Sequence, residues 1–169
     1  MTADFHLSAF LPYRLAVLSE RISRRLSVEY DDSHGLTVAE WRVLVHLRRS
    51  GAVSVRDIHD CVNLEKPRVS RAVGRLERDG LVSKSATDGD GRLVAISLTE
   101  AGEAALAEIL PRARSFEQSL RDAVPPEDLD TFFRVMERWH AVLDADPAAR
   151  PRARLDLDGL DAPRADTPR

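Results

Sequence analysis

The chain has 169 residues, 43% of them hydrophobic, which is enough for one compact unit with a buried core. No apolar run approaches the roughly 18 residues that span a membrane, and the N-terminus lacks a signal-peptide pattern, so we expect a cytoplasmic protein without membrane contact. A single cysteine excludes an intrachain disulfide. The net charge of −3 is unevenly spread: residues 41–98 hold eleven Lys/Arg and seven Asp/Glu, a net of +4, whereas the remainder holds fourteen and twenty-one, a net of −7. A basic surface on an acidic body is therefore expected.

Residues 7–30 predict a first long helix, because large aliphatic residues recur at spacings of three and four. This stripe consists of Leu11, Leu15, Leu18, Ile22 and Leu26. Residues 31–35 (DDSHG) predict a loop after this helix. A long amphipathic helix has no core of its own, so its apolar face needs a partner within the chain or on a second chain.

Two cap signals predict the next two helices. Thr37 and Glu40 form the capping-box pattern T-x-x-E, which predicts a helix through residue 49. Ser54 can cap a shorter helix over residues 55–62, and a turn at Asn63 would join that helix to the next one. The expected inward residues are Trp41, Leu44, Val45, Leu47, Val55, Ile58 and Val62.

Residues 64–80 (LEKPRVSRAVGRLERDG) predict a helix with two contrasting faces. The spacing of Val69, Ala72, Val73 and Leu76 gives one apolar stripe that a core can bury. The opposite face carries a row of arginines at spacings of three and four, namely Arg68, Arg71, Arg75 and Arg78. A helix buried on one side and lined with arginine on the other suits the DNA major groove, where arginine pairs with guanine.

A β-hairpin is expected directly after this basic helix. Residues 81–86 and 92–98 alternate as strands do, and the glycine-rich segment 87–91 (TDGDG) is a strong turn signal. A helix-turn-helix followed by a hairpin is the order of elements in a winged helix. Arg92 would lie at the wing tip.

The runs LEKPRVSRAVGRLERDGLV (residues 64–82), DGR (90–92) and ISLTEAG (96–102) resemble the MarR family of bacterial transcription regulators. That family has a V-[ST]-R-x-V-x-x-L-E-x-x-G-L-V recognition helix, a D-x-R wing tip and an L-T-x-x-G exit from the wing. The resemblance covers residues 8–144, although Pro67 and Arg68 stand where the family more often has Ser and Thr. It implies a mainly α fold with a small β-hairpin wing, that is, a winged helix-turn-helix with N- and C-terminal dimerisation helices.

Two further helices are expected after the wing. Thr99 can cap a helix over 99–123, in which Pro111 should cause a kink or a break. The helix over 127–143 has a wide aromatic stripe, which indicates either ordinary core or a dimer interface. We therefore predict a MarR-type unit over 7–144, with a DNA-binding core at 36–98, dimerisation helices at 7–30, 99–123 and 127–143, and a Pro/Ala/Arg/Asp-rich tail at 145–169.

This reading predicts a homodimeric repressor that binds a pseudo-palindromic operator in double-stranded DNA. The alternative is a winged helix used only for protein–protein contact, which the row of arginines disfavours. The basic helix would enter the major groove and the wing would place one arginine in the minor groove. The predicted DNA-binding residues are Lys66, Arg68, Ser70, Arg71, Arg75 and Arg92.

The resemblance also implies a small organic or aromatic acid as effector. Arg14 lies at the margin of the first apolar stripe, and a cation there needs an anion. One reading is an ion pair with Glu40 or Asp31; the other is the carboxylate of a bound acid. The predicted effector-binding residues are Tyr13, Arg14, Trp41, Arg42 and His46.

Enzymatic and metal chemistry find little support in the sequence. The chain has no G-x-G-x-x-G, G-x-x-x-x-G-K or G-x-S-x-G motif, and His59-x-Cys61 matches no standard zinc spacing. Cys61 follows Ile58 on the inner side of its helix, which favours a buried structural thiol over a redox sensor. We expect no cofactor, no metal and no catalytic residue.

Overall fold

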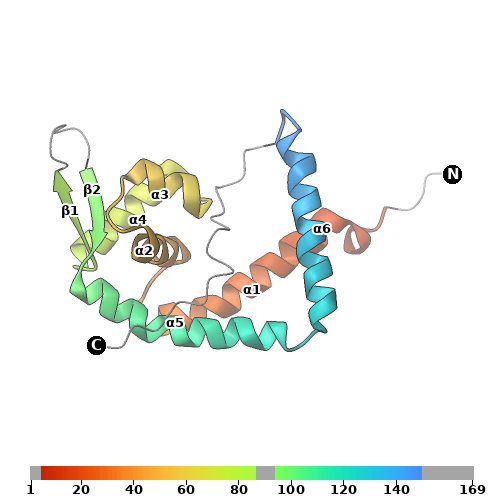
Figure 1. Ribbon diagram of the computed structural model, residues 1–169, viewed down its shortest axis with the longest axis horizontal. Helices are drawn as coiled ribbons and strands as arrows, with labels where there is room; N and C mark the ends of the chain where they lie inside the picture. The colour runs from red at the N-terminus through yellow and green to blue at the C-terminus, as the bar shows by residue number, and fades with distance from the viewer. Residues whose placement is uncertain (1–4, 87–93, 150–169) are drawn as a thin grey trace.

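The computed structural model describes residues 5–86 and 94–149. A helix-turn-helix lobe with its hairpin lies at one end of the molecule, the long helices α1 and α5 run beneath it in contact with one another, and α6 stands at the other end (Figure 1). In chain order the elements are η1 Leu7–Ala9, α1 Leu11–His34, α2 Val38–Ser50, α3 Val55–Val62, α4 Lys66–Arg78, β1 Val82–Ala86, β2 Val94–Leu98, α5 Glu100–Arg121 and α6 Pro126–Asp144. The predicted mainly α fold with a small hairpin is confirmed.

The helix-turn-helix begins where its cap signals place it. The Thr37 hydroxyl accepts a hydrogen bond from the Glu40 N–H (3.4 Å), and the Glu40 carboxylate accepts one from the Thr37 N–H (2.7 Å). Ser54 and Asp57 form a second reciprocal box at the start of α3. These boxes satisfy N–H groups that a helix start leaves unpaired. Asn63 then takes the left-handed conformation (φ 51°) and turns the chain into α4.

The core lies mainly between α2, α3, α4, the base of the wing and the first half of α5. The predicted stripe of α4 is buried in full, with Val69 and Leu76 at 0% exposure. Fully buried residues from the other elements pack in the same cluster: Val43, Leu44, Ile58, Ile96, Leu106 and Ile109. This packing fixes which face of α4 remains in solvent.

The wing is a two-stranded antiparallel hairpin whose register runs from Val82 opposite Leu98 to Ala86 opposite Val94. A backbone bridge between Val53 and Ile96 (N···O 3.0 and 2.8 Å) ties it to the segment before α3. The predicted tip at residues 87–91 and Arg92 lie outside the described residues.

The exit from the wing explains the glycine of the L-T-x-x-G motif. Thr99 caps α5 through the Gly102 N–H (3.1 Å), and its hydroxyl donates to the Gly80 carbonyl (2.7 Å). A Cβ at Gly102 would lie 2.1 Å from the Leu81 carbonyl oxygen, which is far inside van der Waals contact. Only glycine therefore allows the first turn of α5 to pack against the chain that leaves α4.

One expectation about helix limits was wrong. Residues 31–34 are not a loop but the last turn of α1, which Gly35 ends in the left-handed conformation (φ 60°). Contacts from α5 hold this turn: the Arg112 guanidinium donates to the Ser33 hydroxyl (2.7 Å), and His34 Nε2 lies 3.5 Å from a Glu108 carboxylate oxygen. Of the kink or break expected at Pro111, the break does not occur, because α5 is one helix from Glu100 to Arg121.

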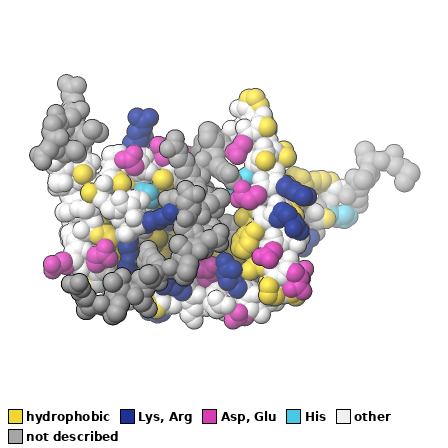
Figure 2. All heavy atoms as spheres, viewed as in Figure 1, with side chains coloured by type: hydrophobic (Ala, Val, Ile, Leu, Met, Phe, Trp, Pro, Cys, Tyr) yellow, Lys and Arg dark blue, Asp and Glu magenta, His cyan; other side chains and the backbone are white. Residues whose placement is uncertain are grey.

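The C-terminal helix contributes no buried residue to the core of the single chain. Hydrophobic side chains remain open along α6 among charged ones (Figure 2). Phe133 is 44% exposed and Val142 69% exposed. No helix in residues 5–86 and 94–149 has the length and apolar character needed to cross a membrane. Residues 150–169 of the predicted tail lie outside the described part of the chain.

Candidate nucleic-acid interface

Helix α4 presents its polar residues to solvent because the core takes its apolar stripe. Pro67 lies in the first turn, where a missing N–H removes no intrahelical bond. The exposed residues include five of the six predicted DNA contacts, namely Lys66, Arg68, Ser70, Arg71 and Arg75. Within the described part of the chain, Arg68 and Arg71 make no ion pair, so their charges are not neutralised by a neighbouring carboxylate.

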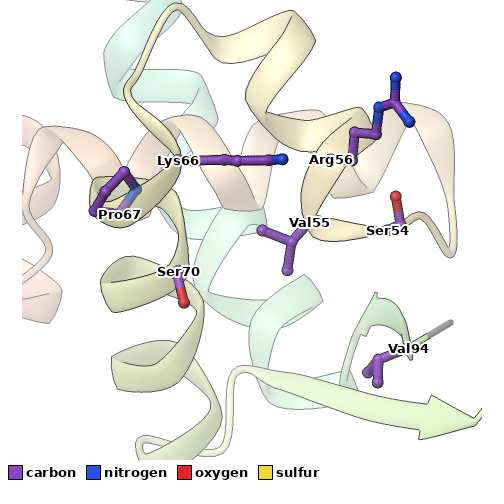
Figure 3. Close-up of a pocket in the computed structure, with 7 residues that line it drawn as sticks. All are labelled: Ser54, Val55, Arg56, Lys66, Pro67, Ser70 and Val94. Atoms are coloured by element: carbon purple, nitrogen blue, oxygen red, sulfur yellow. The ribbon is translucent and has the colours of Figure 1, made fainter. Parts of the chain in front are cut away.

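A first cleft of about 500 Å³ lies between α3, α4 and the base of the wing (Figure 3). Lys66 extends from α4 toward α3, while Arg56 projects from the first turn of α3. The N-terminus of α3 adds partial positive charge from its aligned peptide dipoles. The lining residues are Ser54, Val55, Arg56, Lys66, Pro67, Ser70 and Val94. The Ser54 hydroxyl already donates to the Asp57 carboxylate (2.7 Å). The two cations and the Ser70 hydroxyl suit a phosphate oxygen of a nucleic-acid backbone.

Arg56 is a residue that the sequence reasoning missed. It precedes Asp57, whose carboxylate is hydrogen-bonded by the Ser54 hydroxyl (2.7 Å) and the Ser54 N–H (3.0 Å). These bonds lower the pKa of Asp57, and the charge of Arg56 adds to the effect. The signal that could have found Arg56 is its place just after a helix cap, facing the start of the basic helix.

A second cleft of about 560 Å³ separates α4 from the start of α2. All four arginines of the predicted row line it, together with Thr37, Ala39, Glu40, Ala72 and Gly74. The arginine row therefore occupies one continuous surface, as the spacing predicts. Its members differ, however, in what else they touch.

The Arg75 guanidinium contacts one backbone carbonyl and two carboxylates of the protein. Its Nη2 donates to the Gly35 carbonyl (3.2 Å), and its Nε lies 3.5 Å from a Glu40 carboxylate oxygen and 3.8 Å from an Asp79 oxygen. Arg78, by contrast, donates from Nε to the Gly74 carbonyl of its own helix (3.3 Å). Arg75 thus connects α4 to the end of α1 and the start of α2.

The wing is also tied to α4. Lys84 of β1 lies 2.5 Å from a Glu77 carboxylate oxygen, and the Ser83 and Ser97 hydroxyls bond across the hairpin (3.1 Å). Because Glu77 is on α4, this pair links the wing to that helix.

The predicted effector residues fall into two separate groups. Tyr13 and Arg14 are exposed near the start of α1. Trp41 stacks on Tyr30 near its other end, with ring centroids 5.3 Å apart and planes 11° from parallel. Sixteen residues separate Arg14 from Tyr30, or about 24 Å along a helix. One chain therefore does not bring the two groups together.

The remaining effector candidates lie with Trp41 on α2. Arg42 donates to the Val62 carbonyl (3.2 Å), which joins α2 to the end of α3. His46 is half-buried and close enough to Asp57 to help lower the pKa of that carboxyl. Burial raises the pKa of Tyr30, which the charge of Arg42 partly opposes.

The proposed ion pair of Arg14 with Glu40 or Asp31 was wrong. Glu40 pairs with Arg75 instead. Asp31 follows Arg14 by 17 residues on the same helix, about 25 Å away along its axis. The predicted helix over 7–30 already separates Arg14 from residue 31, so the Asp31 alternative conflicted with that prediction. The pairing of Glu40 with Arg75 depends on the tertiary fold and could not be read from spacing.

An apolar groove of about 710 Å³ runs between the first half of α1 and the last half of α6. Aliphatic and aromatic side chains make up most of its lining: Leu11, Pro12, Leu15, Leu18, Ile22, Phe132, Met136, Trp139, Val142 and Leu143. Most of the predicted stripe of the first helix therefore faces this groove and not the core. Leu26 is the exception, since it packs against the core cluster.

Cys61 and possible metal ligands were the other candidate sites in the sequence. Cys61 is half-buried, whereas a buried structural thiol was predicted. In residues 5–86 and 94–149, no group of three His, Cys, Asp or Glu side chains could hold a metal ion.

A helix-turn-helix with a β-hairpin wing and an arginine-lined second helix defines a winged helix-turn-helix protein of the DNA-binding class. The chain belongs to the MarR family of transcription regulators, as the sequence predicts. A family model described as MarR family matches residues 34–93. The chain is also 31% identical over 119 residues to an HTH-type transcriptional regulator of Bacillus cereus, an alignment that covers 70% of this chain and 79% of the relative.

Solved structures agree with this assignment. A MarR family transcriptional regulator from Silicibacter pomeroyi is 30% identical, with a TM-score of 0.66 and coverage of 81% of this chain and 91% of that one. BpsR of Bordetella bronchiseptica is 26% identical, with a TM-score of 0.74 and coverage of 85% of this chain and all of the other. The protein is accordingly a transcription regulator of the MarR family.

Proposed function

We propose that the protein is a homodimeric repressor that binds a pseudo-palindromic operator and releases it when a small aromatic or organic acid binds. The observation that carries this proposal is the exposed cationic face of α4 above a fully buried stripe, combined with apolar faces of α1 and α6 that the single chain leaves open. A regulator of this kind works in the cytoplasm, at the nucleoid.

Base reading is assigned to the N-terminal half of α4. Arg68, Ser70 and Arg71 are exposed there, and the two arginines are without ion pairs in the described part of the chain. An arginine can bond the O6 and N7 of guanine together, which gives discrimination of about 1–3 kcal/mol against a wrong base. Lys66 and Arg56 at the first cleft would bind phosphate, and Arg92 would enter the minor groove from the wing.

Dimerisation is assigned to α1, α5 and α6. The groove between α1 and α6 is apolar, and a helix that contributes no residue to the core yet carries Phe132, Phe133 and Trp139 needs a partner surface. A second copy of the chain offers the same face, so a two-fold interface can close on itself. Two recognition helices would then meet half-sites about 34–36 Å apart.

The effector is proposed from both the residues and a relative. BpsR is a protein whose DNA binding is regulated by 6-hydroxynicotinic acid, an aromatic acid. In this chain Arg14 and Tyr13 lie about 24 Å along α1 from the level of Trp41. A site that contains all five predicted residues would therefore need the start of α1 from a second chain next to α2 of the first.

The test separates this proposal from a winged helix that contacts only proteins. Wild-type protein is used to select duplexes from a random DNA library, and binding to the selected duplex is compared with binding to a scrambled one. Enrichment of a palindrome supports the proposal, whereas equal binding to both duplexes contradicts it. Addition of 6-hydroxynicotinic acid and substituted benzoates then tests release.

A further inference from the structure

Arg75 was expected to contact DNA together with Arg68 and Arg71, but its surroundings indicate a different role. Its guanidinium bridges three elements: it donates to the Gly35 carbonyl at the end of α1, faces Glu40 at the start of α2, and belongs to α4. We propose that Arg75 is a positioning residue that sets the orientation of the recognition helix on the dimerisation helix, and thereby the half-site spacing that the dimer accepts. This inference rests on the proposed function of a dimer on a palindrome.

Gly35, Glu40 and Arg75 form a junction between α1, α2 and α4. The charges at this junction favour a positioning role for Arg75 over a phosphate contact. The Glu40 side chain is only 4% exposed, and its other oxygen already accepts the Thr37 N–H at 2.7 Å. If Arg75 turned away to a phosphate, a buried carboxylate would lose its cation and would face a second anion. With Glu40 at 3.5 Å and Asp79 at 3.8 Å, the charge of Arg75 is already compensated by the protein.

The geometry of the junction explains how Arg75 could control the spacing between the two DNA half-sites. Gly35 ends α1 in the left-handed conformation, and its N–H donates to the Asp31 carbonyl (2.7 Å) while its own carbonyl accepts from Arg75 (3.2 Å). The end of the dimerisation helix is therefore bonded to the middle of the recognition helix through one side chain. A change in the angle between α1 and α4 must lengthen or break that bond.

The chain offers matched variants for a test. Glu40→Gln removes the charge next to Arg75 but can keep the capping box, because glutamine serves at that position too. Glu40 is buried, so this variant removes no residue that could reach DNA. Arg75→Gln removes the other partner. Arg78→Gln is the control, because Arg78 lies on the same helix face and bonds only its own helix in the described contacts.

The probe is the palindrome that the wild-type dimer selects from a random library, together with versions that have one base pair added or removed between the half-sites. Wild type is expected to prefer the selected spacing by about tenfold or more, within the usual range of coupling between sites. Arg75→Gln and Glu40→Gln should both reduce this preference at least threefold while keeping the half-site sequence preference. Arg78→Gln should keep the wild-type preference for spacing.

The alternative is that Arg75 contacts a DNA phosphate, and a salt titration together with amide exchange distinguishes it from the positioning role. A phosphate contact on each chain would lower the slope of log affinity against log salt by about two per dimer. A lower slope for Arg75→Gln, with wild-type spacing preference in Glu40→Gln, would overturn the inference. Faster exchange of the Gly35 and Leu36 amides in both junction variants, but not in Arg78→Gln, supports it even without DNA, and unchanged exchange contradicts it. If wild type selects no palindrome, the proposed function fails separately.

Discussion

Gly102 lies where the backbone leaves no room for a side chain. Replacing it with alanine places a methyl group 2.1 Å from the Leu81 carbonyl oxygen and 3.1 Å from Leu98 Cδ2. The carbonyl belongs to the backbone that joins α4 to β1 and accepts the Thr99 N–H (3.1 Å), so it cannot move without disturbing the wing. Gly102→Ala should therefore destabilise the protein and shift the wing relative to the recognition helix.

The magnitude follows from two opposing effects. Alanine in place of glycine stabilises a helix interior by up to about 1 kcal/mol. Overpacking against a rigid neighbour costs about 1–3 kcal/mol, and a 2.1 Å approach to a backbone atom belongs at or beyond the upper end of that range. The net loss is expected to be about 2 kcal/mol or more, and a loss of about 2 kcal/mol lowers the melting temperature of a chain of this size by about 4–8 °C.

Gly74→Ala is the matched control, because no atom lies within 4 Å of a Cβ built at Gly74 in α4. This variant should gain about 0.5–1 kcal/mol from helix propensity alone. Thermal and urea unfolding of both variants, followed by circular dichroism at one protein concentration, measures the difference. Equal stability of the two variants would refute the packing argument at the wing exit.

Three further predictions concern ligands. Arg71→Ala should weaken operator binding by about 1–3 kcal/mol and relax sequence preference, whereas Arg78→Ala should weaken all duplexes alike if it acts at all; equal losses on operator and random DNA would limit Arg71 to phosphate. Arg92→Ala should weaken binding and flatten its salt dependence without lowering the melting temperature, and normal affinity would remove the minor-groove role. Arg14→Ala should abolish release of DNA by benzoates, cinnamates or phenols in gel shifts; release equal to wild type would make Arg14 a structural residue.

Local signals in the sequence predicted most of the DNA-binding lobe. The cap residues Thr37 and Ser54, the α4 stripe and the hairpin each depend on neighbours a few residues away, and all lie where expected. The length of α1 could not be predicted in this way. Asp31, Asp32 and Ser33 are weak helix formers, but Arg112 contacts Ser33 and Glu108 contacts His34, so residues more than 70 positions later hold the last turn of α1.

The parts of the site that depend on distant contacts also required the structure. The arginine row was visible from spacing, yet the pairing of Arg75 with Glu40 joins residues 35 positions apart. The motif glycine at Gly102 was recognised as a family signature, but its reason is the Leu81 carbonyl 21 residues earlier. The expected effector residues failed to meet in one chain because α1 holds Arg14 far from Tyr30 and Trp41.

The most direct test of the central claim is the stoichiometry and footprint of the complex with a selected duplex. Native mass spectrometry should give two chains per duplex, and hydroxyl-radical footprinting should show two symmetric protected half-sites about 34–36 Å apart. The free protein should likewise be a dimer, because the apolar groove between α1 and α6 needs a cover. A single chain bound to one asymmetric half-site, with a monomeric free protein, would contradict the account.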